Sequence, residues 1–187
     1  MNSRRPAPHI IHRRRTALLI VVVLLIWGVW SGVSAISGLI FGGAKAANIQ
    51  ACATGVVSVT AYAGDGEKHL DTFDANTKPY IWFSVVNNGK VACKFNTAAG
   101  VQFFRIKNAD QVIWSSEQCD RKGLAMDAEI VLKPGQPVTS PRGQWMKVYS
   151  SGGGCGDGQA PAMPGDYSLT VEVNKVVSGN YEAFTLQ

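Results

Sequence analysis

Histidine is scarce in this chain of 187 residues. His9 and His12 lie in an arginine-rich N-terminal tail, so His69 is the one histidine in the rest of the sequence. A Ser-His-Asp or Cys-His catalytic site would therefore depend on that single residue. No glycine-rich segment follows a strand pattern and opens a helix, so nucleotide binding also lacks a basis in the sequence. We expect a protein that is not an enzyme and needs no cofactor.

Charged residues are absent from residues 16–44, where Leu, Ile, Val and Trp dominate. As a helix this stretch would be roughly 43 Å long at 1.5 Å per residue. Because a bilayer needs only about 20 apolar residues, the sequence predicts a transmembrane signal-anchor at 16–44, embedded in membrane lipid. Basic residues stay on the cytoplasmic side, so residues 1–15 form a cytoplasmic tail and the C-terminal part lies outside. The residues that set this topology are Arg4, Arg5, Arg13, Arg14 and Arg15.

Excess charge is also missing beyond the anchor. The whole chain has 18 Lys+Arg and 13 Asp+Glu, and taking away the five arginines of the tail leaves 13 basic residues against 13 acidic ones. A neutral remainder has no electrostatic footprint for nucleic acid, so we expect no nucleic-acid partner.

The apolar stretch leaves two questions open. Residues 33–35 could serve as a signal-peptidase site, and the protein would then be secreted after cleavage following Ala35. The stretch continues apolar beyond Ala35, which favours a retained anchor and a single-pass protein of the cell membrane. Gly28 and Gly32 are four residues apart, a spacing at which small residues let two spans approach and form a homodimer.

The four cysteines, Cys52, Cys93, Cys119 and Cys155, all follow the anchor. None forms a CxxC pair or the spacing of a zinc site. An even number of cysteines in an exported domain predicts two disulfides. Three pairings are open, and we favour Cys93–Cys119, between neighbouring strand regions, with Cys52–Cys155.

Helical periodicity is missing after residue 50, and short apolar or alternating runs separated by Gly, Pro and Asn take its place. These runs predict strands. The turns are signalled by Asn-Asn-Gly at 87–89 and Pro-Gly at 134–135. The predicted strands are 57–61, 79–86, 91–95, 101–106, 111–114, 128–132, 145–149, 166–173 and 181–186. We expect an all-β protein, an antiparallel β-sandwich over residues 56–187, after a short stalk at 45–55.

Two groups of residues could bind a ligand. The acidic run at 64–76, with His69 inside it, could hold calcium, but its spacing does not match an EF-hand and a solvated loop is the simpler interpretation. Trp82, Trp114 and Trp145 could form an aromatic platform, although packing in the core or at a sheet edge explains them better.

Several motifs follow one another in a familiar order: VVNNG at 85–89, VIW at 112–114, LKPG at 132–135, Trp145 and PGDYSL at 164–169. Over residues 52–187 the chain resembles the immunoglobulin-like domain of the bacterial intracellular proteinase inhibitor family. It is more similar still to cysteine-containing, membrane-anchored or secreted actinobacterial relatives of that domain. The resemblance implies an Ig-like fold and raises protease inhibition as a function.

Inhibition would require an exposed, rigid loop that fits a protease cleft. Residues 150–164, held at Cys155, are the candidate, although five glycines make this segment a poor wedge. The candidate binding residues of the loop are Gly153, Gly154, Gly156 and Asp157.

The sequence therefore predicts a non-enzymatic protein of the bacterial cell envelope. A single span would display an Ig-like domain that binds another protein or a cell-wall component. The alternatives are an inhibitor of an exported protease and an envelope module that binds a small ligand or a metal ion.

Overall fold

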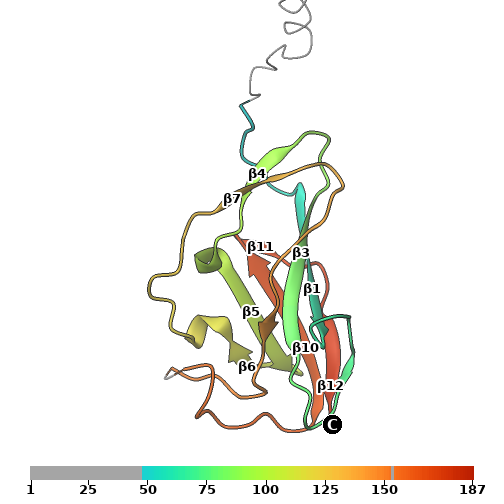
Figure 1. Ribbon diagram of the computed structural model, residues 1–187, viewed down its shortest axis with the longest axis vertical. Helices are drawn as coiled ribbons and strands as arrows, with labels where there is room; N and C mark the ends of the chain where they lie inside the picture. Colours follow the sequence, from blue (N-terminus) through green and yellow to red (C-terminus); the bar gives the residue numbers. More distant parts are fainter. Residues whose placement is uncertain (1–47, 153) are drawn as a thin grey trace, which may run out of the picture. The chain divides into compact units, whose positions relative to one another are not determined.

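The computed structural model describes residues 48–152 and 154–187. Asn48–Gln187 form one compact unit that is mostly β-structure, as expected (Figure 1). The predicted tail, anchor, cleavage site and homodimer face lie outside the described residues. Within these residues, none of the helices has the length and apolar character needed to cross a bilayer. The helical turns are two short 3-10 segments, η1 (Ala99–Val101) and η2 (Ser116–Gln118).

The first sheet is built on a long hairpin-like pair of strands. β1 (Val57–Gly64) runs antiparallel to β3 (Tyr80–Asn87), and β8 (Val138–Thr139) and β9 (Gly143–Gln144) pair with the other edge of β3. Alternate residues of β1 are buried, as a period of two requires when one face of a strand covers a core. Strand β3 is buried on both faces, since Trp82 packs against Tyr62 on the outer side.

The second sheet has the order β2-β12-β10-β5-β6, and β11 pairs with β10. Its pairs are antiparallel except for β2 with β12, which is parallel. The strands are β2 (Thr72–Phe73), β5 (Gln102–Asn108), β6 (Gln111–Ser115), β10 (Gly165–Val173), β11 (Val176–Val177) and β12 (Glu182–Leu186). The long strand β10 lies at the centre, and its alternate residues point into the core.

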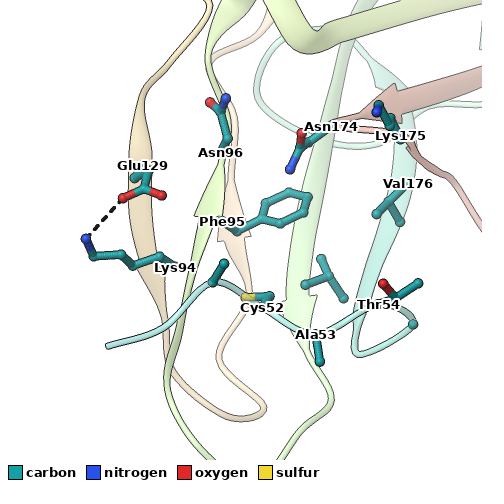
Figure 2. A pocket seen from close by; sticks show the side chains of 13 residues that line it. Cys52, Ala53, Thr54, Lys94, Phe95, Asn96, Glu129, Asn174, Lys175 and Val176 are labelled. Atoms are coloured by element: carbon teal, nitrogen blue, oxygen red, sulfur yellow. Dashed lines mark ion pairs between the residues drawn. The ribbon is translucent and has the colours of Figure 1, made fainter. Parts of the chain in front are cut away.

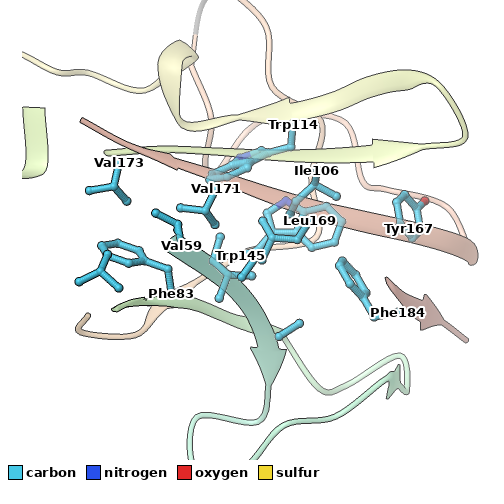
Figure 3. Packing of buried hydrophobic residues seen from close by; sticks show 14 of the residues in the cluster. Val59, Phe83, Ile106, Trp114, Trp145, Tyr167, Leu169, Val171, Val173 and Phe184 are labelled. Atoms are coloured by element: carbon cyan, nitrogen blue, oxygen red, sulfur yellow. The ribbon is translucent and has the colours of Figure 1, made fainter. Parts of the chain in front are cut away.

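The two sheets share a single hydrophobic core, which gives the unit a sandwich-like form. Figure 3 shows Val59 and Phe83 of the first sheet on one side and Leu169 of the second on the other. Trp145 lies among them with no exposed surface and packs edge-on against Tyr167. The core therefore forms between sheets, with a loop tryptophan filling its centre.

A third, short ladder covers the end of the sandwich where residue 48 enters. β4 (Cys93–Asn96) pairs with β7 (Glu129–Leu132) on one side. On its other side it takes residues 50–52, because Lys94 N–H donates to Gln50 O and Cys52 N–H donates to Lys94 O, both at 2.8 Å. The end of the predicted stalk is thus part of the folded unit.

Most predicted strands are confirmed within a few residues, but the one at 145–149 is wrong. Lys147 has a φ of 56°, which breaks extended backbone. Trp145 N–H donates to Pro79 O, next to the end of the β3–β9 pairing, and Val148 makes only an isolated bridge, to Pro161. The apolar residues here belong to a loop that inserts Trp145 into the core.

Two disulfides are present, as predicted, but the favoured pairing is wrong. The bonds are Cys52–Cys93 and Cys119–Cys155. Cys52 bonds to Cys93 because residues 50–52 run beside β4. Cys155 bonds to Cys119 because its loop packs on β6, where Ser150 N–H donates to Ile113 O, and Cys119 follows β6 directly after η2.

Candidate functional site

The predicted binding loop at 150–164 lies at the lower end of the unit in Figure 1, away from residue 48. Its two arms are joined at the base, where Tyr149 N–H donates to Ala160 O at 2.8 Å and Val148 bridges to Pro161. Nearer the tip, the Ser151 hydroxyl donates to Gln159 Oε1 at 2.9 Å. The loop is therefore a closed structure with its own hydrogen bonds.

The described residues of this loop include Gly154, Gly156 and Asp157 from the predicted site, while Gly153 lies outside the described residues. Gly154 has a φ of 150° and pairs with Ser151 in both directions. The Asp157 side chain is exposed to solvent. The tip of the loop thus exposes backbone groups together with the Asp157 carboxylate.

Trp114 and the cystine fix this loop to the second sheet. The indole Nε1–H of Trp114 donates to Cys155 O at 2.8 Å, and Cys155 is bonded to Cys119. Trp114 of β6 and Cys119, directly after η2, therefore hold the same residue. Sequence reasoning identified the cysteine but missed the indole, because a buried tryptophan carries no signal for the acceptor of its N–H.

The segment that carries Cys119 is held by an ion pair. Arg105 on β5 donates from Nε and Nη2 to the two carboxylate oxygens of Glu117, at 2.9 and 3.0 Å, and from Nη1 to Glu172 at 3.0 Å. The Ser115 hydroxyl donates to Glu117 as well. The hydrogen bonds from Arg105 hold the pKa of the Glu117 carboxyl below its ordinary value. This bidentate geometry orients η2 and so positions the cystine.

The acidic run at 64–76 uses its carboxylates to close turns. Asp65 accepts hydrogen bonds from the backbone N–H groups of Glu67 and Lys68, at 2.8 and 2.9 Å. Asp74 accepts from Asn76 and Thr77 in the same way. Hydrogen bonds from Lys68, above all, lower the pKa of Asp65, and those from Thr77 lower the pKa of Asp74. Each of these two side chains is thus part of a turn.

His69 is drawn to the second sheet, where its Nε2 pairs with Glu182 on β12. All four cysteines are in disulfides, so no thiol is left as a nucleophile. Within residues 48–152 and 154–187, no three His, Cys, Asp or Glu side chains gather closely enough to hold a metal ion. In the described residues, His69 is thus occupied by a carboxylate and the cysteines by each other.

The three candidate platform tryptophans are buried, with 6%, 8% and 0% of Trp82, Trp114 and Trp145 exposed. Trp114 and Trp145 belong to the core between the sheets. Trp82 is stacked on Tyr62, and the Arg142 guanidinium lies over its ring at 5.1 Å. Their faces are occupied by neighbouring side chains, as the packing interpretation expects.

A pocket of about 340 Å³ opens at the end where residue 48 enters. Figure 2 shows the Phe95 ring projecting between its walls and the amide of Asn174 directed toward that ring. Lys94 and Glu129 form an ion pair at 3.1 Å on one rim, and Lys175 lies on the other. The pocket combines an apolar floor with a polar rim, which sequence reasoning did not find because its residues come from four separate segments.

Comparison with known proteins shows no matching family and no matching curated protein. Among solved structures, the chain is similar to a β-glucosidase from Erythrobacter marinus, with 16% identity, 70% of this chain and 15% of that chain covered, and a TM-score of 0.39. An alkylpurine DNA glycosylase from Pseudomonas fluorescens, bound to DNA, gives 12% identity, coverage of 71% and 30%, and a TM-score of 0.38. A CARDB domain from Pyrococcus furiosus gives 14% identity, coverage of 70% and 94%, and a TM-score of 0.31. The chain thus spans less than a third of the two enzymes, and at these TM-scores the likenesses carry no inference about function.

Proposed function

We propose that this chain is a membrane-tethered, non-enzymatic recognition protein of the bacterial cell envelope. Its apolar stretch at 16–44 anchors it, its β-sandwich is Ig-like and lies outside the cytoplasm, and the loop at 150–164 binds another protein or a cell-wall component. The mostly antiparallel sheets that share one core support the Ig-like assignment. The absence of charge from residues 16–44 supports the anchor.

The two disulfides support an exported domain. Disulfides persist in oxidising compartments and are rare in the cytosol. Cys52–Cys93 and Cys119–Cys155 close loops of 41 and 36 residues in sequence. Bonds of this kind stabilise a domain that must survive outside the cell.

The observation that carries the recognition role is the preorganised loop. A loop that is already ordered loses less conformational entropy when it binds than a flexible one does. Here the cystine, the Trp114 indole and the Ser151–Gln159 hydrogen bond order a segment rich in glycine. These restraints also stabilise the fold, but with Asp157 exposed beside them they suit the capture of a partner.

Photo-crosslinking in native membranes tests this proposal. A benzophenone amino acid in place of Asp157, in the full chain, should give a discrete adduct, and one in place of the exposed Tyr181, just before β12, should not. Replacing Cys119 and Cys155 by serine should abolish the adduct at position 157, because the loop then loses its order. An adduct that forms equally at both positions, or that persists without the cystine, contradicts the proposal, as does the absence of any adduct at 157.

The same loop supports a second candidate, inhibition of an exported protease. An exposed loop anchored by a cystine is what a protease cleft accepts. Incubating the full chain with a panel of serine and metalloproteases distinguishes the two functions. Stoichiometric inhibition that is lost in the Cys119→Ser/Cys155→Ser variant would support the inhibitor, and full protease activity throughout would eliminate it.

The third candidate, binding of a small ligand or a metal ion, rests on the pocket beside Phe95 and on the acidic run. Calcium should raise the melting temperature if the acidic run binds it. An unchanged melting curve with calcium leaves the run as a set of closed turns.

A further inference from the structure

Lysines gather at the end of the sandwich where residue 48 enters. Lys90 lies in the turn after β3, Lys94 on β4, Lys133 directly after β7, and Lys175 in the turn between β10 and β11. We call these four residues the lysine end. The sheet register brings them together, because Val57 at the start of β1 pairs with Asn87 at the end of β3. The end of β7 lies beside the start of β4, and residues 51–57 share a pocket with residues 174–176.

Positive charge predominates at this end. Three of its lysines are exposed and unpaired in the described residues, and Lys94 is half-exposed beside Glu129. The nearby acids are Asp127, Glu129 and Glu172, and Glu172 is already paired with Arg105, which leaves the lysines in excess. Val91, next to Lys90, is 74% exposed at the tip of the same turn. Cationic side chains around an exposed apolar residue are typical of surfaces that lie on a membrane.

The opposite end has a different character. Gly64 pairs with Tyr80 there, Gly165 pairs with Leu186, and Asn108 donates from its amide to Asp166 O. The carboxylates of this end are Asp65, Asp71, Asp74, Asp110 and Asp166. Lys68, Lys78, Arg142 and Lys147 lie among these carboxylates, so charges of both signs are mixed at this end, whereas lysines are in excess near residue 48.

The lysine end could contact either the anionic headgroups of the membrane or an anionic wall polymer. The length of chain before residue 48 favours the headgroups. The uncharged stretch ends at Ala44, and four residues span at most roughly 14 Å. Charges on a protein act over about 8 Å at physiological ionic strength, so an anchored domain would keep its lysine end close to that range from the headgroups. An anionic wall polymer farther from the bilayer has no comparable constraint to hold it there.

We propose that the lysine end docks on the anionic headgroups of the membrane in which the chain is anchored. The inference rests on the proposed anchor. Docking would direct the loop at 150–164 away from the bilayer, since that loop lies at the other end of the unit (Figure 1). Each lysine at an anionic surface contributes an affinity of about five-fold.

Lysine labelling in the reconstituted full chain tests the proposal. The protein is placed in vesicles of phosphatidylcholine alone or of phosphatidylcholine with phosphatidylglycerol. An amine-reactive reagent is added, and labelling is read at each lysine by mass spectrometry. Lys90, Lys94, Lys133 and Lys175 should react several-fold more slowly in the anionic vesicles, and high salt should remove the difference. Lys68 and Lys78, at the other end, should react equally in both.

Two charge-matched variants provide the control. Lys90→Gln/Lys133→Gln/Lys175→Gln should abolish the protection of Lys94, which remains as a reporter. Lys68→Gln/Lys78→Gln/Lys122→Gln removes the same charge from exposed positions elsewhere and should leave that protection intact.

Three outcomes overturn the proposal. Equal labelling of the lysine end in both vesicles, with the chain inserted, rejects docking but leaves the anchor standing. Protection by isolated wall polymer in place of anionic lipid assigns the surface to another occupant. A chain that does not float with vesicles rejects the anchor and the docking together.

Discussion

Asn87 is a buried amide that joins three segments at the lysine end. Its Nδ2 donates to Val91 O at 2.8 Å and to Leu132 O at 3.1 Å, and its Oδ1 accepts from Gly89 N–H at 2.8 Å. The side chain is completely inaccessible to solvent. It therefore fixes the turn after β3 to the end of β7. From the sequence, Asn87 was predicted only to form a turn.

Replacing Asn87 by alanine should destabilise the protein by about 3 kcal/mol, because each buried polar group left without a partner costs about 1–3 kcal/mol. Denaturant unfolding of the full chain measures this loss. Asn88→Ala is the matched control, since Asn88 is exposed and its amide donates only to Ser58 Oγ. That change should stay within about 0.5 kcal/mol. Equal effects of the two variants would contradict the role of Asn87.

Glu117 links stability to pH through its pair with Arg105. The pKa of its carboxyl is lowered from 4.5 in the folded protein, so the stabilisation is present above that value and is lost as the pH falls through the lowered one. Because the side chain is 42% exposed, the pair contributes under about 1 kcal/mol.

We expect Glu117→Gln to melt below the wild type at neutral pH, and the gap between them to close in acid, where Glu117 is itself protonated. Thermal melts at neutral pH and well below the ordinary pKa measure both gaps. Glu67→Gln is the control, since it removes an exposed carboxylate from the turn closed by Asp65. A gap of constant size across this pH range would contradict the assignment.

Among the elements, two segments are held by covalent links: residues 50–52 beside β4, and the loop at 150–164 beside η2. Cys119–Cys155 closes 36 residues and Cys52–Cys93 closes 41. In the chain-entropy description, loops of this length give a stabilisation of about 4 kcal/mol for each bond.

Removing either bond by paired Cys→Ser changes should therefore lower the free energy of unfolding by a similar amount, about 2–5 kcal/mol. Hydrogen exchange then separates the two. Loss of Cys119–Cys155 should speed exchange at Ser150 and Tyr149, and loss of Cys52–Cys93 should speed it at Lys94. Uniform acceleration in both variants would show that the bonds do not act locally.

The long strands were predictable because their side chains alternate over a buried face, as in β1 and β10. The strands β2, β8, β9 and β11 have two residues each, which is too short for an alternating pattern to be recognised in the sequence. Residues 145–149 were wrongly predicted as a strand because four of the five are apolar or aromatic. Lys147 has a positive φ there, which no pattern in the sequence indicates. Cys52 pairs with Cys93 because residues 50–52 lie beside β4. The spacing of the cysteines in the sequence does not predict this contact.

The candidate site was predictable only in part. Cys155 and the glycines around it marked a loop, because glycine and cysteine have known structural uses. Trp114 contacts the loop directly, and Glu117 positions the cystine through its ion pair with Arg105. Both contacts depend on the register in which β5 pairs with β6, which the sequence does not specify. The pocket beside Phe95 was hidden for the same reason.

At the scale of the whole molecule, the compartment and the fold depend on the same four sulfur atoms. We expect the protein extracted from membranes to take up no alkylating reagent before reduction and four equivalents afterwards, since the described cysteines are all paired. Intact-mass spectrometry counts the adducts. Carrying out the extraction with the reagent already present controls for oxidation during handling. Labelling without reduction would indicate a reducing compartment and remove the basis for an exported domain.

The Cys52–Cys93 bond also decides how this protein bears mechanical load. Tension applied at Asn48 reaches Cys52 after four residues and crosses directly to β4, which is itself paired with β7. The hairpin of β1 and β3 lies inside the covalent loop and is bypassed. A pull on the leading end would thus be carried by a sulfur–sulfur link and a short ladder, and β1 and β3 would keep their length under strain.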